Sequence, residues 1–150
     1  MTKRREDEAQ RLDNCLCFAV YSTAHAINRV YKPLLEALDL TYPQYIVMLT
    51  LWQRDVVNVK EIGEQLHLDS GTLTPLLKRL EAAGLVKRNR DAADERQVRI
   101  SLTPAGQAMR EKAKSIPHEI ISATGRSGPE VQALKAELIR LRDRLNAATS

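Results

Sequence analysis

The segment from Val56 to Gly106 constrains the fold more than any other part of the chain. Its composition is that of an amphipathic helix, a turn, a second helix and a basic hairpin, followed by a new helix start at Thr103. This order of elements is typical of a winged helix-turn-helix, in which one helix enters the DNA major groove and the hairpin lies against the flanking backbone. We therefore predict a DNA-binding core over about residues 56–104.

Two short helices are expected within this core. An apolar stripe over residues 59–68 predicts the first, and the second covers about residues 70–83, with Asp69 or Ser70 as its cap and Gly84 at its end. Small hydroxyl groups at a helix N-terminus suit DNA contact, as do cations further along, although capping alone also explains Ser and Thr. The candidate DNA-binding residues of the second helix are Ser70, Gly71, Thr72, Thr74, Lys78 and Arg79.

Positive charge is concentrated in the predicted hairpin. Five cations lie between residues 87 and 99 and face only three carboxylates, whereas the whole chain has a net charge of only +4. A wing needs a positive tip that follows phosphates or inserts an arginine into a narrow minor groove. We expect Arg96 to make this insertion, with Asp94 either orienting its guanidinium or locking the loop by an ion pair, and Arg88 and Arg90 to add DNA contacts.

Helical periodicity continues on the N-terminal side of the core. It extends over about residues 8–31, after which Pro33 is expected to open a short helix at residues 34–38. Thr41 has the position of an N-cap that forms a capping box with the glutamine three residues later. Residues 45–52 are apolar on nearly every side, which predicts a buried central helix.

Further helices are predicted after the hairpin. Pro104 starts one of them, Pro117 bends or interrupts it, and residues 125–129 separate a last amphipathic helix. The apolar faces of the terminal helices need a partner, and the simplest partner is a second copy of the chain. We expect a mainly α fold with a small β-hairpin wing, dimerisation helices at about residues 8–40 and 105–148, and a two-fold homodimer that binds a pseudo-palindromic double-stranded DNA operator.

Composition argues against several other classes of protein. The 150 residues, 43% of them hydrophobic, suffice for a single domain with a core. Residues 1–8 lack the apolar stretch of a signal peptide and no apolar run is long enough for a bilayer, so we expect a cytoplasmic protein without a membrane partner. Two cysteines, three scattered histidines and widely spaced glycines give no zinc, disulfide or nucleotide pattern, so no metal, cofactor or catalytic group is expected.

Cys17 lies in an otherwise apolar helical segment. A thiolate attacks a peroxide oxygen quickly, so a reactive sulfur needs hydrogen-bond donors or positive charge beside it. The commoner fate of a lone thiol in an apolar helix is inert burial. The helix by itself therefore leaves both interpretations open.

Four segments resemble the organic-hydroperoxide repressors, a branch of the MarR family of dimeric winged-helix regulators. The resemblance covers essentially residues 12–145, and the wing pattern Asp-x-Arg is common to the wider family. The four segments are NCLCF at 14–18, LTYPQY at 40–45, LDSGTLTPLL at 68–77 and DERQV at 94–98.

The resemblance implies a role for Cys17 as the peroxide-sensing residue. It implies that Tyr31 and Tyr42 hydrogen-bond the sulfur, one of them from the second subunit, and that Tyr21 belongs to the same cluster. The implied function is repression of a peroxidase gene, relieved when an organic hydroperoxide oxidises Cys17.

Two positions depart from the family pattern. Cys15 stands where the family usually has no cysteine. Residues two apart on a helix point to nearly opposite sides, so a bridge to Cys17 would require unwinding, and we interpret Cys15 as a packing or incidental residue. Ser122 stands about where the two-cysteine branch has its resolving cysteine. We therefore expect the sulfenic acid of Cys17 to react with a low-molecular-weight thiol or to oxidise further.

Two other functions fit the sequence. The first is a MarR-type repressor relieved by a non-covalent phenolic or lipophilic ligand near Tyr42, with Cys17 as a bystander. The second is a thiol peroxidase, although no group for recycling the thiolate is evident. Replacing Cys17 by serine separates the first from a redox sensor, and catalytic peroxide consumption with a thiol reductant would indicate the second.

Overall fold

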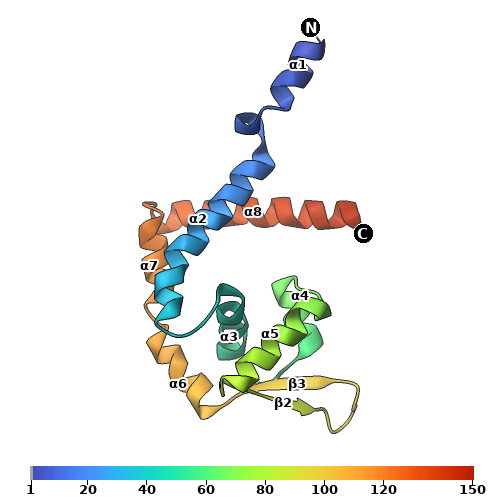
Figure 1. Cartoon of the computed structure of the whole chain (residues 1–150), viewed down its shortest axis with the longest axis vertical. Helices are drawn as coiled ribbons and strands as arrows, with labels where there is room; N and C mark the ends of the chain where they lie inside the picture. Colours follow the sequence, from blue (N-terminus) through green and yellow to red (C-terminus); the bar gives the residue numbers. More distant parts are fainter. Residues whose placement is uncertain (1) are drawn as a thin grey trace. The chain divides into compact units, whose positions relative to one another are not determined.

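The computed structural model describes residues 2–150 (Figure 1). It divides into a first compact unit that ends at Lys114 and a second from Ser115 to Ser150. The first unit is helical with one small antiparallel sheet, and the second is entirely helical in its regular elements. The predicted fold class, mainly α with a hairpin wing, is confirmed.

The N-terminal segment forms three helical elements instead of one. These are α1 (Thr2–Ala9), the short 3₁₀ helix η1 (Leu12–Asn14) and α2 (Leu16–Glu36). The Asn14 side-chain amide donates to the Glu8 carbonyl oxygen at 2.9 Å, which satisfies an end group that a continuous helix would have paired internally. The predicted helix over residues 8–31 is therefore wrong at its start.

Helix α2 also continues through Pro33, where the sequence predicts a new helix at residues 34–38. Proline removes only one backbone donor, and a single turn of α2 follows it. The last turn also places Leu35 in the core, where it is buried. Burial of this side chain offsets the missing hydrogen bond, so the predicted break is wrong.

The centre of the first unit is helix α3 (Tyr42–Gln53). Thr41 accepts from the Gln44 backbone N–H and the Gln44 side chain accepts from the Thr41 backbone N–H, which confirms the predicted capping box. Buried side chains occur all round this helix, as its sequence predicts. Helices α2, α4, α5 and α6 all contact it.

The predicted helix pair is present as α4 (Val59–Leu66) and α5 (Ser70–Ala82). His67 adopts a left-handed conformation that ends α4, and Asp69 caps α5 by accepting from the Thr72 backbone N–H at 2.7 Å. Gly84, with φ of +77°, follows the end of α5 as predicted.

A three-stranded antiparallel sheet follows in the order β1-β3-β2. The strands are β1 (Val57–Asn58), β2 (Val86–Arg90) and β3 (Val98–Leu102), and β1 is a short edge strand. Ile100 of β3 is paired with both neighbouring strands and is buried. The β2–β3 hairpin extends beyond α4 and α5 (Figure 1), which leaves its tip free to contact a partner.

Helix α6 (Pro104–Lys112) begins directly after β3. The Trp52 indole N–H donates to the Gly106 carbonyl oxygen at 3.0 Å, and this buried hydrogen bond joins α3 to the first turn of α6. A Cβ atom at Gly106 would overlap the Leu85 carbonyl oxygen. Glycine therefore permits the close approach between α6 and the start of the hairpin.

The second unit contains α7 (Ile116–Ala123) and α8 (Gly128–Thr149). Pro117 lies in the first turn of α7, so the predicted interruption at this proline is confirmed. Ser127 caps α8 and forms a capping box with Glu130. Over residues 2–150, no helix combines the length and the apolar character that a membrane span requires.

Candidate nucleic-acid interface and thiol segment

Helix α5 has two distinct faces. Four leucines face the core and are buried, namely Leu73, Leu76, Leu77 and Leu80. The predicted DNA-binding residues lie outside this buried face: Thr74 is half-buried, while Ser70, Gly71, Thr72, Lys78 and Arg79 are exposed. The Thr72 backbone N–H lowers the pKa of the Asp69 carboxyl, so the cap stays ionised and keeps the N-terminus of the helix formed.

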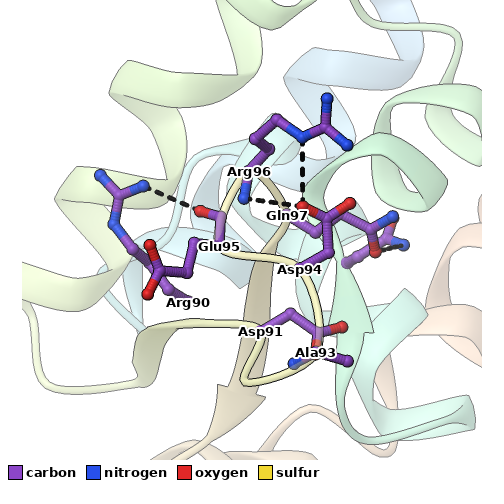
Figure 2. Close-up of polar contacts among 8 residues, drawn as sticks. Arg90, Asp91, Ala93, Asp94, Glu95, Arg96 and Gln97 are labelled. Atoms are coloured by element: carbon purple, nitrogen blue, oxygen red, sulfur yellow. Dashed lines mark hydrogen bonds and ion pairs between the residues drawn. The ribbon is translucent and has the colours of Figure 1, made fainter.

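The wing tip is shaped by Asp94 and Arg96 (Figure 2). One Asp94 carboxylate oxygen accepts from the Arg96 backbone N–H at 3.1 Å and from its Nε–H at 3.2 Å. The Arg96 side chain is nevertheless 92% exposed. Asp94 thus pairs with Arg96, as the sequence predicts, while the contact of Arg96 with DNA stays a prediction.

The base of the wing is held by three further interactions. Arg90 donates from Nη1 to the Glu95 carbonyl oxygen at 2.9 Å (Figure 2), so this predicted DNA contact also braces the loop. Asp91, whose side chain is only 11% exposed, accepts from the Ala93 backbone N–H at 2.9 Å and pairs with Arg99 at 3.0 Å. The Ala93 N–H and then the Arg99 charge lower the pKa of the Asp91 carboxyl.

The sequence analysis assigned no role to Asp91 or Arg99. Their opposite charges at the two ends of the hairpin loop were the available signal, because antiparallel strands bring such ends together.

A groove of roughly 560 Å³ lies between α4, α5 and the wing. Leu73 and Leu77 supply apolar lining, while Lys60, Arg88 and Arg96 supply positive charge. The Arg88 Nε is buried and makes no hydrogen bond within the described residues. The groove therefore separates the two elements that are predicted to contact DNA, and Arg88 lies inside it.

Three tyrosines cluster where α2 meets α3. The ring centres of Tyr31 and Tyr42 are 4.9 Å apart, and Tyr45 lies 5.8 Å from Tyr31 and 6.5 Å from Tyr42. Burial, with smaller contributions from Tyr42 and Tyr45, raises the pKa of Tyr31 to about 12. The hydroxyl consequently remains protonated and able to donate.

Tyr45 was not among the predicted site residues. Its position three residues after Tyr42 on a capped helix was the signal, because residues at this spacing share a face.

Cys17 and Tyr21 lie far from this cluster within one chain. Both are exposed, and the Tyr21 ring packs edge-on against His25 at 4.4 Å. Tyr31 follows Cys17 by 14 positions on the same helix, which corresponds to a separation of about 21 Å at 1.5 Å per residue. Accordingly, no hydrogen bond joins the Cys17 sulfur to a tyrosine within residues 2–150.

The described residues contain no group of three or more His, Cys, Asp or Glu side chains that could hold a metal ion. The two cysteines are free thiols. The helix pair α4–α5, the three-stranded sheet and the charged hairpin together define a winged helix-turn-helix protein.

Comparisons with known proteins agree with this class. The profile described as transcriptional regulator SarA/Rot matches residues 29–116. The chain is 52% identical to the HTH-type transcriptional regulator TtmR of Methylorubrum extorquens over 98% of the chain and 75% of that protein. It is 47% identical to the organic hydroperoxide resistance transcriptional regulator of Bacillus subtilis over 91% of the chain and 92% of that protein.

Solved structures of AbfR from Staphylococcus epidermidis are also similar. Reduced AbfR bound to DNA has a TM-score of 0.83 and 36% identity, covering 97% of this chain and 99% of that one. Disulfide-formed AbfR has a TM-score of 0.61 and 37% identity, with 97% of both chains covered. The chain belongs to the MarR family of winged-helix transcriptional regulators, in the branch of the organic-hydroperoxide regulators, as its sequence predicts.

Proposed function

We propose that this chain is a homodimeric repressor that binds a pseudo-palindromic DNA operator and releases it when an organic hydroperoxide oxidises Cys17. In this proposal α5 enters the major groove and the wing contacts the flanking backbone. The protein acts as a stoichiometric sensor and not as an enzyme. The terminal helices, at about residues 8–40 and 105–148, form the dimer.

The observation that carries the proposal is the arrangement of helix α2. Cys17, Ala24 and Tyr31 recur every seven residues, so they lie on nearly the same face of the helix. Several apolar side chains on the adjoining side of α2 are exposed in the single chain, namely Leu16, Val20 and Ile27. Such a face calls for a partner helix.

A second copy of α2 supplies that partner. If two copies cross antiparallel near Ala24, each Cys17 comes opposite the Tyr31 of the other copy, because both residues lie seven positions from this point. The Cys17 thiol and the Tyr31 ring lie about 21 Å apart within one chain, but in such a dimer the thiol of one copy lies beside the tyrosine of the other. The tyrosine cluster then offers neutral O–H donors to a thiolate, which favours its formation.

The surroundings of Cys17 favour an organic peroxide. A shallow groove of roughly 410 Å³ at the start of α2 is lined by Leu12 and Phe18 together with Arg11 and Asp13. Apolar groups of this kind gain more from contact with an alkyl chain than with water or hydrogen peroxide. The name of the Bacillus subtilis relative, an organic hydroperoxide resistance regulator, supports the same class of signal.

The AbfR structures support redox control of DNA binding. The reduced, DNA-bound form is more similar to this chain than the disulfide form, with TM-scores of 0.83 and 0.61. Disulfide formation in that relative is therefore accompanied by a different conformation, whereas its overoxidised form is bound to DNA. A comparable change here would move the two α5 helices away from the half-site spacing of the operator.

A DNA-binding titration tests the proposal. Operator affinity is measured for the reduced protein and after one equivalent of cumene hydroperoxide, with Cys17→Ser as the matched variant. We expect the oxidised wild type to bind at least about tenfold more weakly and the variant to remain bound. Equal affinity of the thiol and oxidised forms would refute the redox mechanism.

The same experiment separates the alternatives. A Cys17→Ser variant that is still released by an added phenolic ligand would indicate a ligand-controlled regulator. Continuous consumption of the hydroperoxide in the presence of a thiol reductant would indicate a peroxidase.

A further inference from the structure

The two cysteines lie in different backbone environments. Helix α2 begins at Leu16, and Cys15 precedes it in an extended conformation with φ of −89° and ψ of 111°. Cys17 is the second residue of the helix. The sequence-based argument against a Cys15–Cys17 bridge assumes that both residues lie in one helix, and that assumption is wrong.

The separation of the two residues is compatible with a disulfide. Helical residues two positions apart have Cα atoms about 5.4 Å apart by helix geometry, and an extended segment gives at most about 7 Å. Disulfides usually span about 4.4–6.8 Å between Cα atoms. The Cα–Cα distance therefore already permits a disulfide, and only the directions of the two cysteine side chains must change.

Few interactions oppose that adjustment. The Cys15 side chain makes no capping hydrogen bond, although it occupies the N-cap position. The first backbone hydrogen bond of the helix joins the Ala19 N–H to the Cys15 carbonyl oxygen at 3.2 Å. The N–H groups of Leu16 and Cys17 have no partner within the helix, so rotating the first turn breaks little.

We propose that Cys15 is the resolving thiol of the sensor and forms a disulfide with Cys17 of the same chain after oxidation. This inference rests on the proposed function, because it requires a hydroperoxide to oxidise Cys17 first. The sequence has only two cysteines, so no other thiol of the chain is available. Both are exposed and free in the chain, and their closeness in sequence gives them a high effective concentration.

The reaction has two steps. The Cys17 thiolate attacks the terminal oxygen of the hydroperoxide, an S–O bond forms, the O–O bond breaks and the alkoxide leaves as the alcohol after protonation. The Cys15 sulfur then attacks the Cys17 sulfur, the S–S bond forms, and hydroxide leaves with the Cys15 proton as water. Two thiols are oxidised by two electrons, and the hydroperoxide is reduced to alcohol and water.

The bridge would couple oxidation to the dimer. Closing it redirects the first turn of α2, where the exposed apolar side chains Leu16 and Phe18 lie. In the proposed dimer this turn contacts the second copy. Oxidation would thus alter the subunit contact without a thiol from outside the protein.

The test uses the full-length reduced protein, one equivalent of cumene hydroperoxide and no small thiol. Remaining thiols are blocked with a maleimide, and intact mass and peptide mapping identify the product. We expect the wild type to lose two hydrogens, to take up no maleimide and to contain the bridge within one peptide. Operator affinity should fall at least about tenfold and return on addition of dithiothreitol.

Cys15→Ser is the matched variant, and it should bind the operator normally when reduced. We expect it to gain one oxygen that dimedone traps and, only when further equivalents of hydroperoxide are added, two or three oxygens; dithiothreitol should restore it at the one-oxygen stage alone. A wild type that accumulates the same oxygenated products, or a bridge between two chains, overturns the inference. Failure of the proposed function itself is distinct, because Cys17 would then remain a thiol in both proteins or its oxidation would leave operator affinity unchanged.

Discussion

At the residue scale, Asp91 illustrates how one carboxylate supports a binding loop from beneath. It accepts a hydrogen bond from the Ala93 backbone N–H and pairs with Arg99 across the base of the wing. Neither partner is a predicted DNA contact. Asp91 therefore supports the wing that carries Arg96 without being a predicted DNA contact itself.

We predict that Asp91→Ala weakens operator binding by about threefold to tenfold, since the loss of a hydrogen-bonded brace allows more loop conformations. Fluorescence anisotropy with labelled operator measures the effect. Asp13→Ala, which removes the exposed Arg11–Asp13 ion pair, is the matched control and should leave affinity unchanged. Equal losses in the two variants would contradict the role of Asp91.

The lowered pKa of Asp91 gives this brace a pH dependence. A carboxyl whose pKa is lower in the folded protein contributes stability above its unfolded pKa, and this contribution is lost as the pH falls through the folded pKa. We therefore predict that wild type and Asp91→Asn differ in unfolding free energy at neutral pH and converge in acid. Chemical denaturation over a range of pH values checks the prediction, and a constant difference would oppose it.

Tyr31 has the opposite dependence at high pH. Burial raises its pKa from 10.0 to about 12, so the folded protein holds the hydroxyl proton more tightly than the unfolded chain. Its stabilising contribution is complete below pH 10 and is lost as the pH rises toward 12. We predict that Tyr31→Phe removes part of the alkaline loss of stability. Denaturation at several alkaline pH values, with tyrosinate absorbance recorded, measures it, and unchanged pH dependence would argue against the assignment.

At the element scale, the contact between α3 and α6 sets the position of the wing. Trp52 donates to the Gly106 carbonyl oxygen, and Gly106 lies against the Leu85 carbonyl oxygen just before β2. The buried central helix, the start of α6 and the start of the hairpin thus meet at one glycine. A Cβ atom at position 106 would meet backbone atoms of Leu85, so the backbone itself must move to admit a side chain. Rotation of neighbouring side chains cannot provide that space.

We predict that Gly106→Ala destabilises the protein by about 1–3 kcal/mol. Urea denaturation gives the unfolding free energy. Gly128→Ala, at the start of α8, is the control, because a Cβ atom there meets nothing within 4 Å. That variant should be neutral or slightly stabilising, and a Gly106 variant as stable as the control would refute the packing argument.

At the scale of the whole molecule, exposed apolar side chains occur on both terminal helical regions. In the second unit, Leu134 and Leu138 of α8 are 50% and 47% exposed. Apolar side chains at such spacing form one face of a helix, and a face of this kind is typical of a subunit contact. The single chain therefore contains the parts of a dimer contact without its partner.

We predict that the protein sediments as a dimer of 16.9 kDa chains and that Leu138→Glu weakens association by at least about tenfold, because a charge is desolvated at the contact. Sedimentation equilibrium measures the change. Gln132→Glu adds the same charge at another exposed position of α8 and should remain dimeric. A wild type that is monomeric at micromolar concentration would contradict the proposal.

The outline of the first unit could be predicted from local signals. Capping residues such as Thr41 and Asp69, the positive φ at Gly84 and the alternating hairpin strands each act within a few positions. Their chemistry limits the backbone directly, and so the predicted helix pair, wing and family membership hold. Errors arose where distant contacts compete with local preference, as at Pro33, where burial of Leu35 keeps α2 continuous.

The sequence by itself determined which residues form the helix pair and the charged wing, and its resemblance to a family predicted the sensor thiol and its tyrosines. Only the tertiary structure decided that Tyr45 joins Tyr31 and Tyr42, that Asp91 braces the wing, and that Cys15 precedes helix α2. The physical reason is the distance along the chain over which each interaction acts. Caps and turns act between neighbours along the chain, whereas ring packing, ion pairs across a hairpin and the exact start of a helix depend on what the rest of the fold places beside them.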